Sequence, residues 1–274
     1  MKGIPKPRAG GIVRFGKRKA RRDDRNLMFA ALLKPPPAPP AEYDFDVAHH
    51  GIPTPMFGND EYGDCVIAGR AHQTLRFEKA EQNKLVKISA NDVLHEYFNQ
   101  TGGADSGLVV LDSLKEWRSK GWLAAKRRYK IKAFAQINQA RRVEIKRAVY
   151  MDIGVGLGLS LPDAALTQFY AGKPWAVNGG KAGKPNPNNG HYVYVPGYTK
   201  SGPVCVTWGR KQQMTWPFLA KYCDEAYAII DAIDTAKKKR ALDAGKLDAF
   251  LAALRKTKPK AAKRPAARAG DRHG

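Results

Sequence analysis

Residues 58–69 read Gly58-Asn59-Asp60-Glu61-Tyr62-Gly63-Asp64-Cys65-Val66-Ile67-Ala68-Gly69, a polar turn with glycines that leads through its cysteine into a helix-compatible segment. A cysteine in the first turn of a helix meets free N–H groups and the positive end of the helix dipole, and both favour the nucleophilic thiolate. The stretch therefore predicts a reactive Cys65. The alternative is that Cys65 is a small buried apolar residue, as lone cysteines usually are.

Positive charge is concentrated at both ends of the 274-residue chain. Residues 1–26 hold 10 Lys/Arg and 2 Asp, and residues 235–274 hold 13 Lys/Arg and 3 Asp, while the formal net charge of the whole chain is +23. Basic segments of this kind are commonly solvated, and they bind polyanions by counterion release. The two arms predict contact with nucleic acid or another polyanion, or else they only keep the protein soluble.

These shifts in composition divide the chain into three parts. Residues 1–41 are expected to form a basic N-terminal arm and a proline-rich linker, because the prolines from Pro35 to Pro40 form a stiff extended spacer. Residues 42–234 are expected to form one domain. Residues 235–274 are expected to be a basic tail with one short amphipathic helix, Ala241 to Lys256, which either docks a partner or packs back on the domain.

The cysteine count bears on the compartment and on metal binding. Three cysteines, Cys65, Cys205 and Cys223, are too few for a disulfide framework, so we expect a reducing, cytoplasmic compartment. No secretion signal is visible, and no run approaches the roughly 20 apolar residues of a membrane span. Histidines and cysteines lie at no recurrent ligand spacing, so we expect no metal and no cofactor.

Helical patterns dominate the first half of the chain. Helices are predicted from Cys65 to about Gln82, from Ser89 or Asn91 to Phe98, and from Leu108 to Lys120. His72 lies two turns beyond Cys65, about 10 Å along a helix, which is too far for a catalytic base. We therefore interpret His72 as a structural histidine.

Strand patterns dominate the second half, after a further helix predicted from Asn138 to Tyr150. Residues 151–161 alternate glycine with Ile, Val and Leu, which predicts a strand with a bare face where another backbone or a side chain comes close. Three more strands are predicted at 190–198, 202–209 and 226–230, the first of them carrying His191 near its start. The fold class is therefore α+β, with a helical lobe and an antiparallel β lobe.

Cys65 begins a predicted helix, and His191 lies on a predicted strand 126 residues later. This is the two-lobe arrangement of a thiol peptidase, in which the histidine accepts the cysteine proton across a cleft. Flanking residues strengthen this interpretation: Asn59 and Gly63 before the cysteine, the segment from Gly190 to Tyr198 around the histidine, and Trp208-Gly209 beyond it. Over about residues 55–230 the chain resembles the papain-like cysteine peptidases. The resemblance implies a papain-like two-lobe fold, Cys65 and His191 as the catalytic dyad, Asn59 as an oxyanion-hole donor, and Trp208 as a shield over the active site.

A narrower resemblance links the chain to papain-like proteins encoded by phages and bacteria. It rests on the basic, proline-linked N-terminus and on the short motifs Gly58-Asn59-Asp60, Thr207-Trp208-Gly209 and Met214-Thr215-Trp216. It implies a phage-encoded protein that is cytoplasmic in the host cell or associated with the virion.

Three departures from the family pattern bear on activity. Asn59 stands where the family usually has glutamine, and Val66 stands where an aromatic residue usually follows the nucleophile. Val206 occupies the position of the asparagine that orients the histidine, and valine cannot accept the imidazole N–H. Orientation of His191 would then depend on another group or on water. Asp224 and Glu225 are acidic and downstream, but no spacing argument brings either to His191.

Two functions follow from these patterns. The first is a cysteine peptidase that hydrolyses a protein or peptide substrate with a Cys65–His191 dyad. Its N-terminal arm is able to act as a propeptide-like strap. The second is a weak or inactive papain-like scaffold that serves as a structural, nucleic-acid-binding or polyanion-binding phage protein through residues 1–26 and 235–274.

Overall fold

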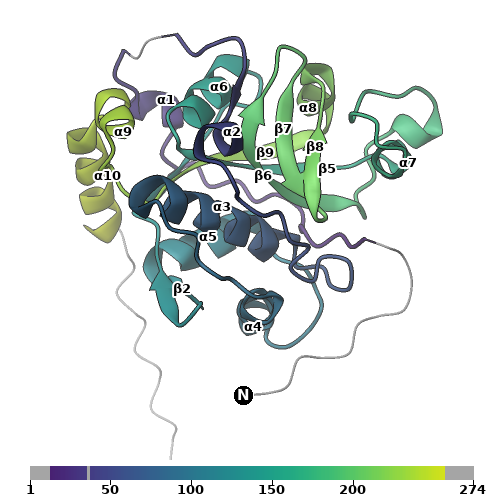
Figure 1. Cartoon of the computed structure of the whole chain (residues 1–274), viewed down its shortest axis with the longest axis horizontal. Coiled ribbons are helices and arrows are strands. Elements are labelled where there is room, and N and C mark those ends of the chain that lie inside the picture. The colour runs from purple at the N-terminus through teal and green to yellow at the C-terminus, as the bar shows by residue number, and fades with distance from the viewer. Residues whose placement is uncertain (1–12, 36–37, 257–274) are drawn as a thin grey trace, which may run out of the picture.

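The computed structural model describes residues 13–35 and 38–256, which form two lobes that meet along helix α3 (Cys65–Gln82) (Figure 1). The helical lobe contains α3, α4 (Ala90–Thr101), α5 (Val110–Ser119) and the hairpin of β2 (Trp122–Ala124) and β3 (Arg127–Tyr129). The second lobe is an antiparallel sheet with helices around it. The predicted α+β fold class, with a helical lobe and a β lobe, is confirmed.

The sheet has the strand order β4-β9-β5-β6-β7-β8, and a short strand β1 also pairs with β6. The strands are β1 (Tyr43–Asp44), β4 (Ala133–Gln136), β5 (Gly154–Ser160), β6 (Gly190–Tyr198), β7 (Pro203–Thr207), β8 (Arg210–Gln213) and β9 (Cys223–Ile230). Every neighbouring pair is antiparallel. Strand β6 is buried along its whole length, so a side chain near its start has a rigid support.

The two faces of the sheet contribute to two separate hydrophobic cores. In β9, Ala226, Ala228 and Ile230 enter one core, whereas Tyr227 and Ile229 enter the other. This alternation follows from the two-residue period of a strand. Helix α3 belongs to the second core and is buried from Cys65 to Glu78, which places the N-terminus of the helix between the lobes.

Strand β5 has the close approaches that its glycines predict. A side chain at Gly156 would overlap the ring of Tyr192, and a side chain at Gly158 would overlap the stem of Lys17 and the carboxyl side chain of Glu225. The bare face is therefore filled by side chains from other elements. The strand predicted within residues 151–161 is confirmed at Gly154–Ser160, and one occupant of its bare face comes from the N-terminal arm.

The remaining helices surround the sheet or join the two ends of the chain to it. They are α1 (Phe29–Leu32), α2 (Phe45–His49), α6 (Arg142–Tyr150), α7 (Asp163–Tyr170), the 3-10 helix η1 (Lys181–Gly183), α8 (Trp216–Tyr222), α9 (Ala236–Ala241) and α10 (Ala244–Lys256). Phe29 and Leu32 of α1 and Leu247 of α10 are fully buried. Residues from both arms thus contribute to the core.

Some predicted boundaries differ from the observed ones. Helix α5 begins at Val110 rather than Leu108, because the main chain of Leu108 instead pairs with the N-terminal arm at Lys17. Helix α6 begins at Arg142 rather than Asn138. The C-terminal region holds two helices, α9 and α10, in place of the single predicted helix over 241–256.

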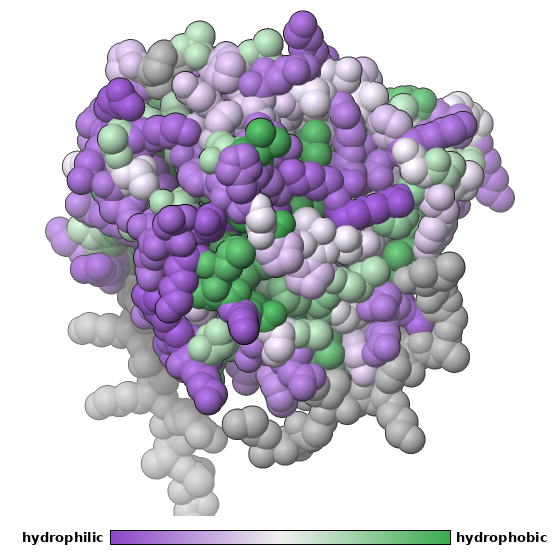
Figure 2. Space-filling model, in the orientation of Figure 1, coloured by the Kyte–Doolittle hydropathy of each residue, from purple (hydrophilic) through white to green (hydrophobic). Residues whose placement is uncertain are grey.

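The surface is mostly polar. Figure 2 shows hydrophilic side chains over most of one face, and the large exposed hydrophobic residues are far apart in the sequence. Within residues 13–35 and 38–256, no helix has the length and apolar character needed to cross a bilayer.

Candidate active site

Cys65 is the first residue of α3 and lies in the interface between the lobes, with 1% of its surface exposed. Burial raises the pKa of the Cys65 thiol to about 12, although the main-chain amides of Tyr192 and Gly16 act in the opposite direction. Burial thus outweighs the effect expected of the helix N-terminus. In this state Cys65 is a thiol.

His191 lies near the start of β6 and is equally buried. Its Nε2 atom is 2.6 Å from the hydroxyl oxygen of Thr207, the last residue of β7. Successive strand residues point to opposite faces, so Thr207 faces the imidazole and Val206 does not. Thr207 is therefore the group that orients His191. The sequence reasoning missed it, because the position of the family's asparagine drew attention to Val206 alone.

The other imidazole nitrogen remains available. His191 Nδ1 has no hydrogen-bond partner among the described residues. Burial lowers the pKa of His191 to about 3, and the charge of Lys17 acts in the same direction. The structure therefore holds a neutral imidazole and a neutral thiol, and a thiolate–imidazolium pair needs a change in the surroundings of both.

Trp208 covers the histidine. Its ring stacks on the imidazole with 4.2 Å between the ring centroids and 23° between the planes. Trp208 and Gly209 both have positive φ angles, of 43° and 77°, which suits the tight turn between β7 and β8. This turn fixes the indole over His191 and shields that side of the imidazole from water.

Asn59 lies in the turn before α3 and is 2% exposed. Its Nδ2 atom donates to the carbonyl of Tyr62 at 3.0 Å and to the carbonyl of Arg14 at 3.4 Å. Arg14 belongs to the N-terminal arm, and the same carbonyl accepts a hydrogen bond from Trp208 Nε1 at 3.2 Å. A peptide carbonyl is thus held by two of the predicted site residues.

Solved structures share this arrangement of lobes. The chain is similar to xylellain, a cysteine protease from Xylella fastidiosa, with 14% identity, a TM-score of 0.61, and coverage of 82% of this chain and 98% of that one. It is also similar to the proform of Amb a 11, a ragweed pollen cysteine protease (15% identity, TM-score 0.54, 76% and 71% covered). A third is procathepsin L 3 of Tenebrio molitor larval midgut (11% identity, TM-score 0.54, 78% and 75% covered).

The chain has the papain-like fold. No protein-family model matches the sequence, and no curated protein matches it either. Because the identities lie between 11% and 15%, the likeness concerns the fold. The roles of Cys65, His191, Asn59 and Trp208 in this papain-like fold stay predictions.

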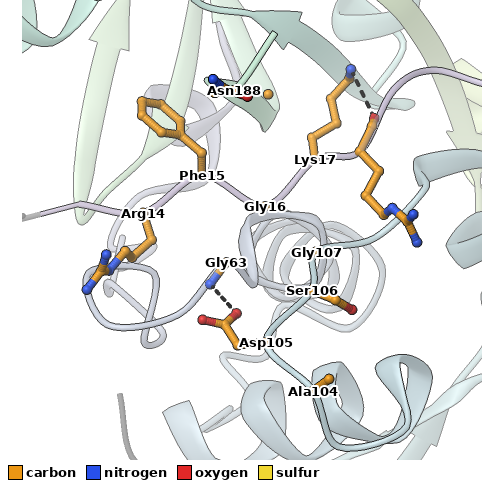
Figure 3. Close-up of a pocket in the computed structure, with 12 residues that line it drawn as sticks. Arg14, Phe15, Gly16, Lys17, Gly63, Ala104, Asp105, Ser106, Gly107 and Asn188 are labelled. Atoms are coloured by element: carbon orange, nitrogen blue, oxygen red, sulfur yellow. Dashed lines mark hydrogen bonds between the residues drawn. The ribbon is translucent and has the colours of Figure 1, made fainter. Parts of the chain in front are cut away.

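A segment of the N-terminal arm, Val13 to Arg18, runs through the cleft of the papain-like fold, and we call it the strap (Figures 1 and 3). On the helical lobe, Leu108 donates to the carbonyl of Gly16 at 2.7 Å and accepts from Arg18 at 2.9 Å. On the sheet lobe, the carbonyl of Gly190 accepts from Gly16 and Lys17 at 3.1 and 3.0 Å. The strap is therefore an extended peptide bound between the lobes.

Side chains of the strap alternate along it. Figure 3 shows Phe15 and Lys17 on one side and Arg14 on the other. Phe15 contacts the His191 and Trp208 rings edge-on, at centroid distances of 6.0 and 5.7 Å. The strap thus covers the candidate dyad and excludes water from it, which accounts for the burial of both groups. A pocket of about 500 Å³ remains beside the strap, lined by Gly63, Asp105, Ser106, Gly107 and Asn188 among others.

Lys17 makes the deepest side-chain contact of the strap. Its Nζ atom is 2.8 Å from Asp224 Oδ2 and 3.6 Å from Glu225 Oε1, and its side chain is 1% exposed. No spacing in the sequence connects Asp224 or Glu225 with the site. The structure connects both carboxylates to it through Lys17, whose charge reaches His191 and Cys65.

Other predicted features have structural roles. His72 is buried and packs against the ring of Phe57, and burial lowers its pKa well below the usual range.

Among residues 13–35 and 38–256 there is no group of three or more His, Cys, Asp or Glu side chains placed to hold a metal ion.

Proposed function

We propose that the chain is a papain-like cysteine peptidase that hydrolyses peptide bonds with Cys65 and His191, and that the strap holds it in a latent state. The observation that carries the proposal is the bound strap itself. The cleft already binds an extended peptide through Asn59, Leu108, Gly190 and Trp208, using main-chain groups of the peptide. Such contacts suit peptide substrates of varied sequence.

The proposed reaction begins when the strap leaves and water enters the cleft. His191 Nδ1 accepts the Cys65 proton, and the thiolate attacks the carbonyl carbon of the substrate to form a C–S bond. Asn59 Nδ2 and the Cys65 N–H donate to the resulting oxyanion. The C–N bond then breaks as the imidazolium gives its proton to the leaving amine.

The acyl-enzyme is released by water. His191 removes a proton from the water, and the hydroxide attacks the thioester. The C–S bond then breaks to leave a carboxylic acid, and the imidazolium returns its proton to the Cys65 thiolate. Thr207 holds the imidazole orientation through both stages. A serine or threonine hydroxyl is a weaker orienting group than a carboxylate, so we expect a modest rate rather than a fast one.

The strap reaches the candidate nucleophile itself. The main-chain amide of Gly16 lowers the pKa of the Cys65 thiol, which indicates that this amide lies close to the sulfur. In the proposed latent state the strap therefore blocks the nucleophile.

The test is the pH dependence of Cys65 alkylation, combined with hydrolysis of a fluorogenic peptide library. Cys205→Ser and Cys223→Ser leave one thiol to report, and Gly16→Ala displaces the strap, since a Cβ at Gly16 would overlap the carbonyl oxygen of Gly63. We expect an apparent thiol pKa below the roughly 8.5 of a free cysteine. It should rise in His191→Ala, and peptide hydrolysis should be lost in Cys65→Ala. An unchanged thiol pKa together with no hydrolysis would contradict the proposal.

The second candidate is a papain-like scaffold that binds nucleic acid or another polyanion. The basic arms favour it, and their outermost residues, 1–12 and 257–274, lie outside the described part of the chain. It predicts salt-sensitive DNA or RNA binding that persists in Cys65→Ala. A phage origin, and a place in the host cytoplasm or on the virion, stay predictions from the sequence motifs.

A further inference from the structure

The pocket that receives Lys17 has the composition of a site for a positively charged side chain. Its acidic groups, Asp224 and Glu225, come from β9, and its other wall comes from Gly158 and Ser160 of β5. The absence of a side chain at Gly158 makes room for the aliphatic stem of Lys17, because a Cβ there would overlap the Lys17 Cε atom. The pocket is therefore shaped for a long side chain with a cation at its end.

Hydrogen bonds hold the two carboxylates in position. Ser160 donates to Asp224 Oδ2 at 3.0 Å, and Tyr227 donates to Glu225 Oε2 at 3.2 Å. Glu225 is 5% exposed, and its second oxygen, Oε1, has no hydrogen-bond partner among the described residues and lies 3.6 Å from Lys17 Nζ. A buried carboxylate oxygen without a donor is costly, so the pocket is stable only with a cation in it or with Glu225 protonated.

Near Lys17, discrimination between the side chains of a bound peptide has to come from this pocket. The contacts on either side of Lys17, to Leu108 and Gly190, use main-chain atoms only and so do not discriminate between sequences. Gly190 also allows the bound chain to come close, since a Cβ at this position would overlap the Lys17 carbonyl oxygen. The bound main chain is thus fixed, and the residue opposite Leu108 has its side chain in the acidic pocket.

We propose that this pocket selects a lysine or arginine side chain in the peptide substrate, and that Lys17 of the strap occupies it as an internal mimic. This inference rests on the proposed peptidase function. It identifies the substrate class as peptides with a basic residue at the position that lies opposite Leu108.

The first experiment uses the full chain with Gly16→Ala and a positional library of fluorogenic peptides. At one position we expect kcat/KM for lysine or arginine to exceed that for norleucine, an uncharged analogue of lysine, by about 10- to 100-fold, the effect of a charge-assisted hydrogen bond. Asp224→Asn and Glu225→Gln should reduce the ratio of kcat/KM between the lysine and norleucine peptides. The matched control is Asp163→Asn, a carboxylate that bonds Asn186 and Asn189 instead.

The second experiment measures binding without catalysis. The chain with Cys65→Ala and Gly16→Ala is titrated with a fluorescent peptide of the strap sequence Val-Arg-Phe-Gly-Lys-Arg and with the same peptide carrying norleucine for lysine. We expect about 10- to 100-fold weaker binding of the norleucine peptide. This comparison changes the peptide and not the protein, so folding of a variant cannot affect it.

The outcomes separate the two proposals. Hydrolysis without a basic preference, or equal binding of the two strap peptides, would overturn the pocket proposal and leave the peptidase intact. Absence of hydrolysis with lysine-dependent binding would overturn the peptidase and support the pocket as a site for basic peptides. Failure of both peptides to bind would overturn the pocket proposal.

Discussion

Thr207 has a specific task at the scale of single residues, because it supplies the only hydrogen bond to the His191 imidazole among the described residues. A hydroxyl group can accept or donate a hydrogen bond, so Thr207 holds the orientation of the imidazole ring in either its neutral or its charged form. The proposed Cys65–His191 dyad therefore has an orienting group for its imidazole without an asparagine at position 206. The hydrogen bond between the Thr207 hydroxyl and His191 is therefore the contact to test first.

We predict that Thr207→Val, made in the strap-released Gly16→Ala chain, lowers kcat for peptide hydrolysis by about 10- to 100-fold, as loss of an orienting partner does at other histidines. Thr207→Ser should retain most of the activity, because it keeps the hydroxyl. Steady-state kinetics check this prediction. Equal losses in both variants would mean that Thr207 acts only by packing.

The strap governs access to the site at the scale of elements. Its hydrogen bonds reach both lobes, to Asn59 and Leu108 on one side and to Gly190 and Trp208 on the other. Because the strap covers Cys65 and burial is what raises its pKa, we expect the strap to affect both the pKa of Cys65 and access to it.

We predict that Gly16→Ala raises the rate of Cys65 alkylation at neutral pH by about 10-fold or more, since forcing a methyl group into a closed contact costs roughly 1–3 kcal/mol. Release of the strap also restores water to the thiol and lowers its pKa from the buried value of about 12. A rate equal to that of the native chain would show that the strap does not limit access. Gly179→Ala, at an open position without a positive φ, controls for a general effect of the substitution on a glycine.

The strap contact is also expected to depend on pH. Burial raises the pKa of Glu225 to about 7, while Lys17 lowers it and Asp224 raises it, and Tyr227 donates a hydrogen bond to it. Burial is the largest cause and the net shift is upward, so the closed state binds a proton at Glu225 more tightly than the open, solvated state does. The contribution of this carboxyl group to strap closure is therefore present at low pH and is lost as the pH rises through about 7.

The measurement is the ratio of Cys65 alkylation rates between the native chain and Gly16→Ala at each pH, since the ratio cancels the titration of the thiol in the open state. We expect the ratio to fall as the pH falls from 8 to about 5, because protonation of Glu225 favours the closed strap. Glu225→Gln should make the ratio less dependent on pH. A ratio that rises toward one on acidification would contradict this linkage.

At the scale of the whole molecule, the C-terminal region is joined to the central helix by a buried ion cluster. Lys238 of α9 has a side chain that is 1% exposed and lies 2.9 Å from Glu81 of α3 and 2.8 Å from Asp231. Removal of the cation would leave two partly buried carboxylates without a partner. Part of a tail that the sequence treats as an appendage thus contributes to the fold.

We predict that Lys238→Met lowers the free energy of unfolding by about 3–5 kcal/mol, the usual cost of removing one partner of a buried pair. Urea denaturation followed by fluorescence checks this. Lys239→Met, one residue further along on the exposed side of α9, should change stability by less than about 0.5 kcal/mol. Equal stability of the two variants would mean that α9 does not hold the fold together.

The sequence alone determined the features that depend on local patterns. Apolar residues three and four positions apart predict the helix that begins at Cys65. Alternation with a two-residue period predicts the strand that carries His191 and the bare glycine face of β5. Both patterns can be recognised within short stretches of sequence. The order of a helical lobe and a β lobe follows from the same patterns, whereas the papain-like fold was implied by the resemblance of the residues around Cys65 and His191 to that family.

Only the tertiary structure decided how distant residues meet. The Thr207 hydroxyl reaches His191 across two paired strands, and Lys17 reaches Asp224 over 207 positions of sequence. No periodicity relates such positions, because their contact depends on the register of β6 with β7 and on the path of the strap between the lobes. For the same reason the un-ionised state of Cys65 could not be predicted, since it comes from burial under a segment that the sequence placed in a solvated arm.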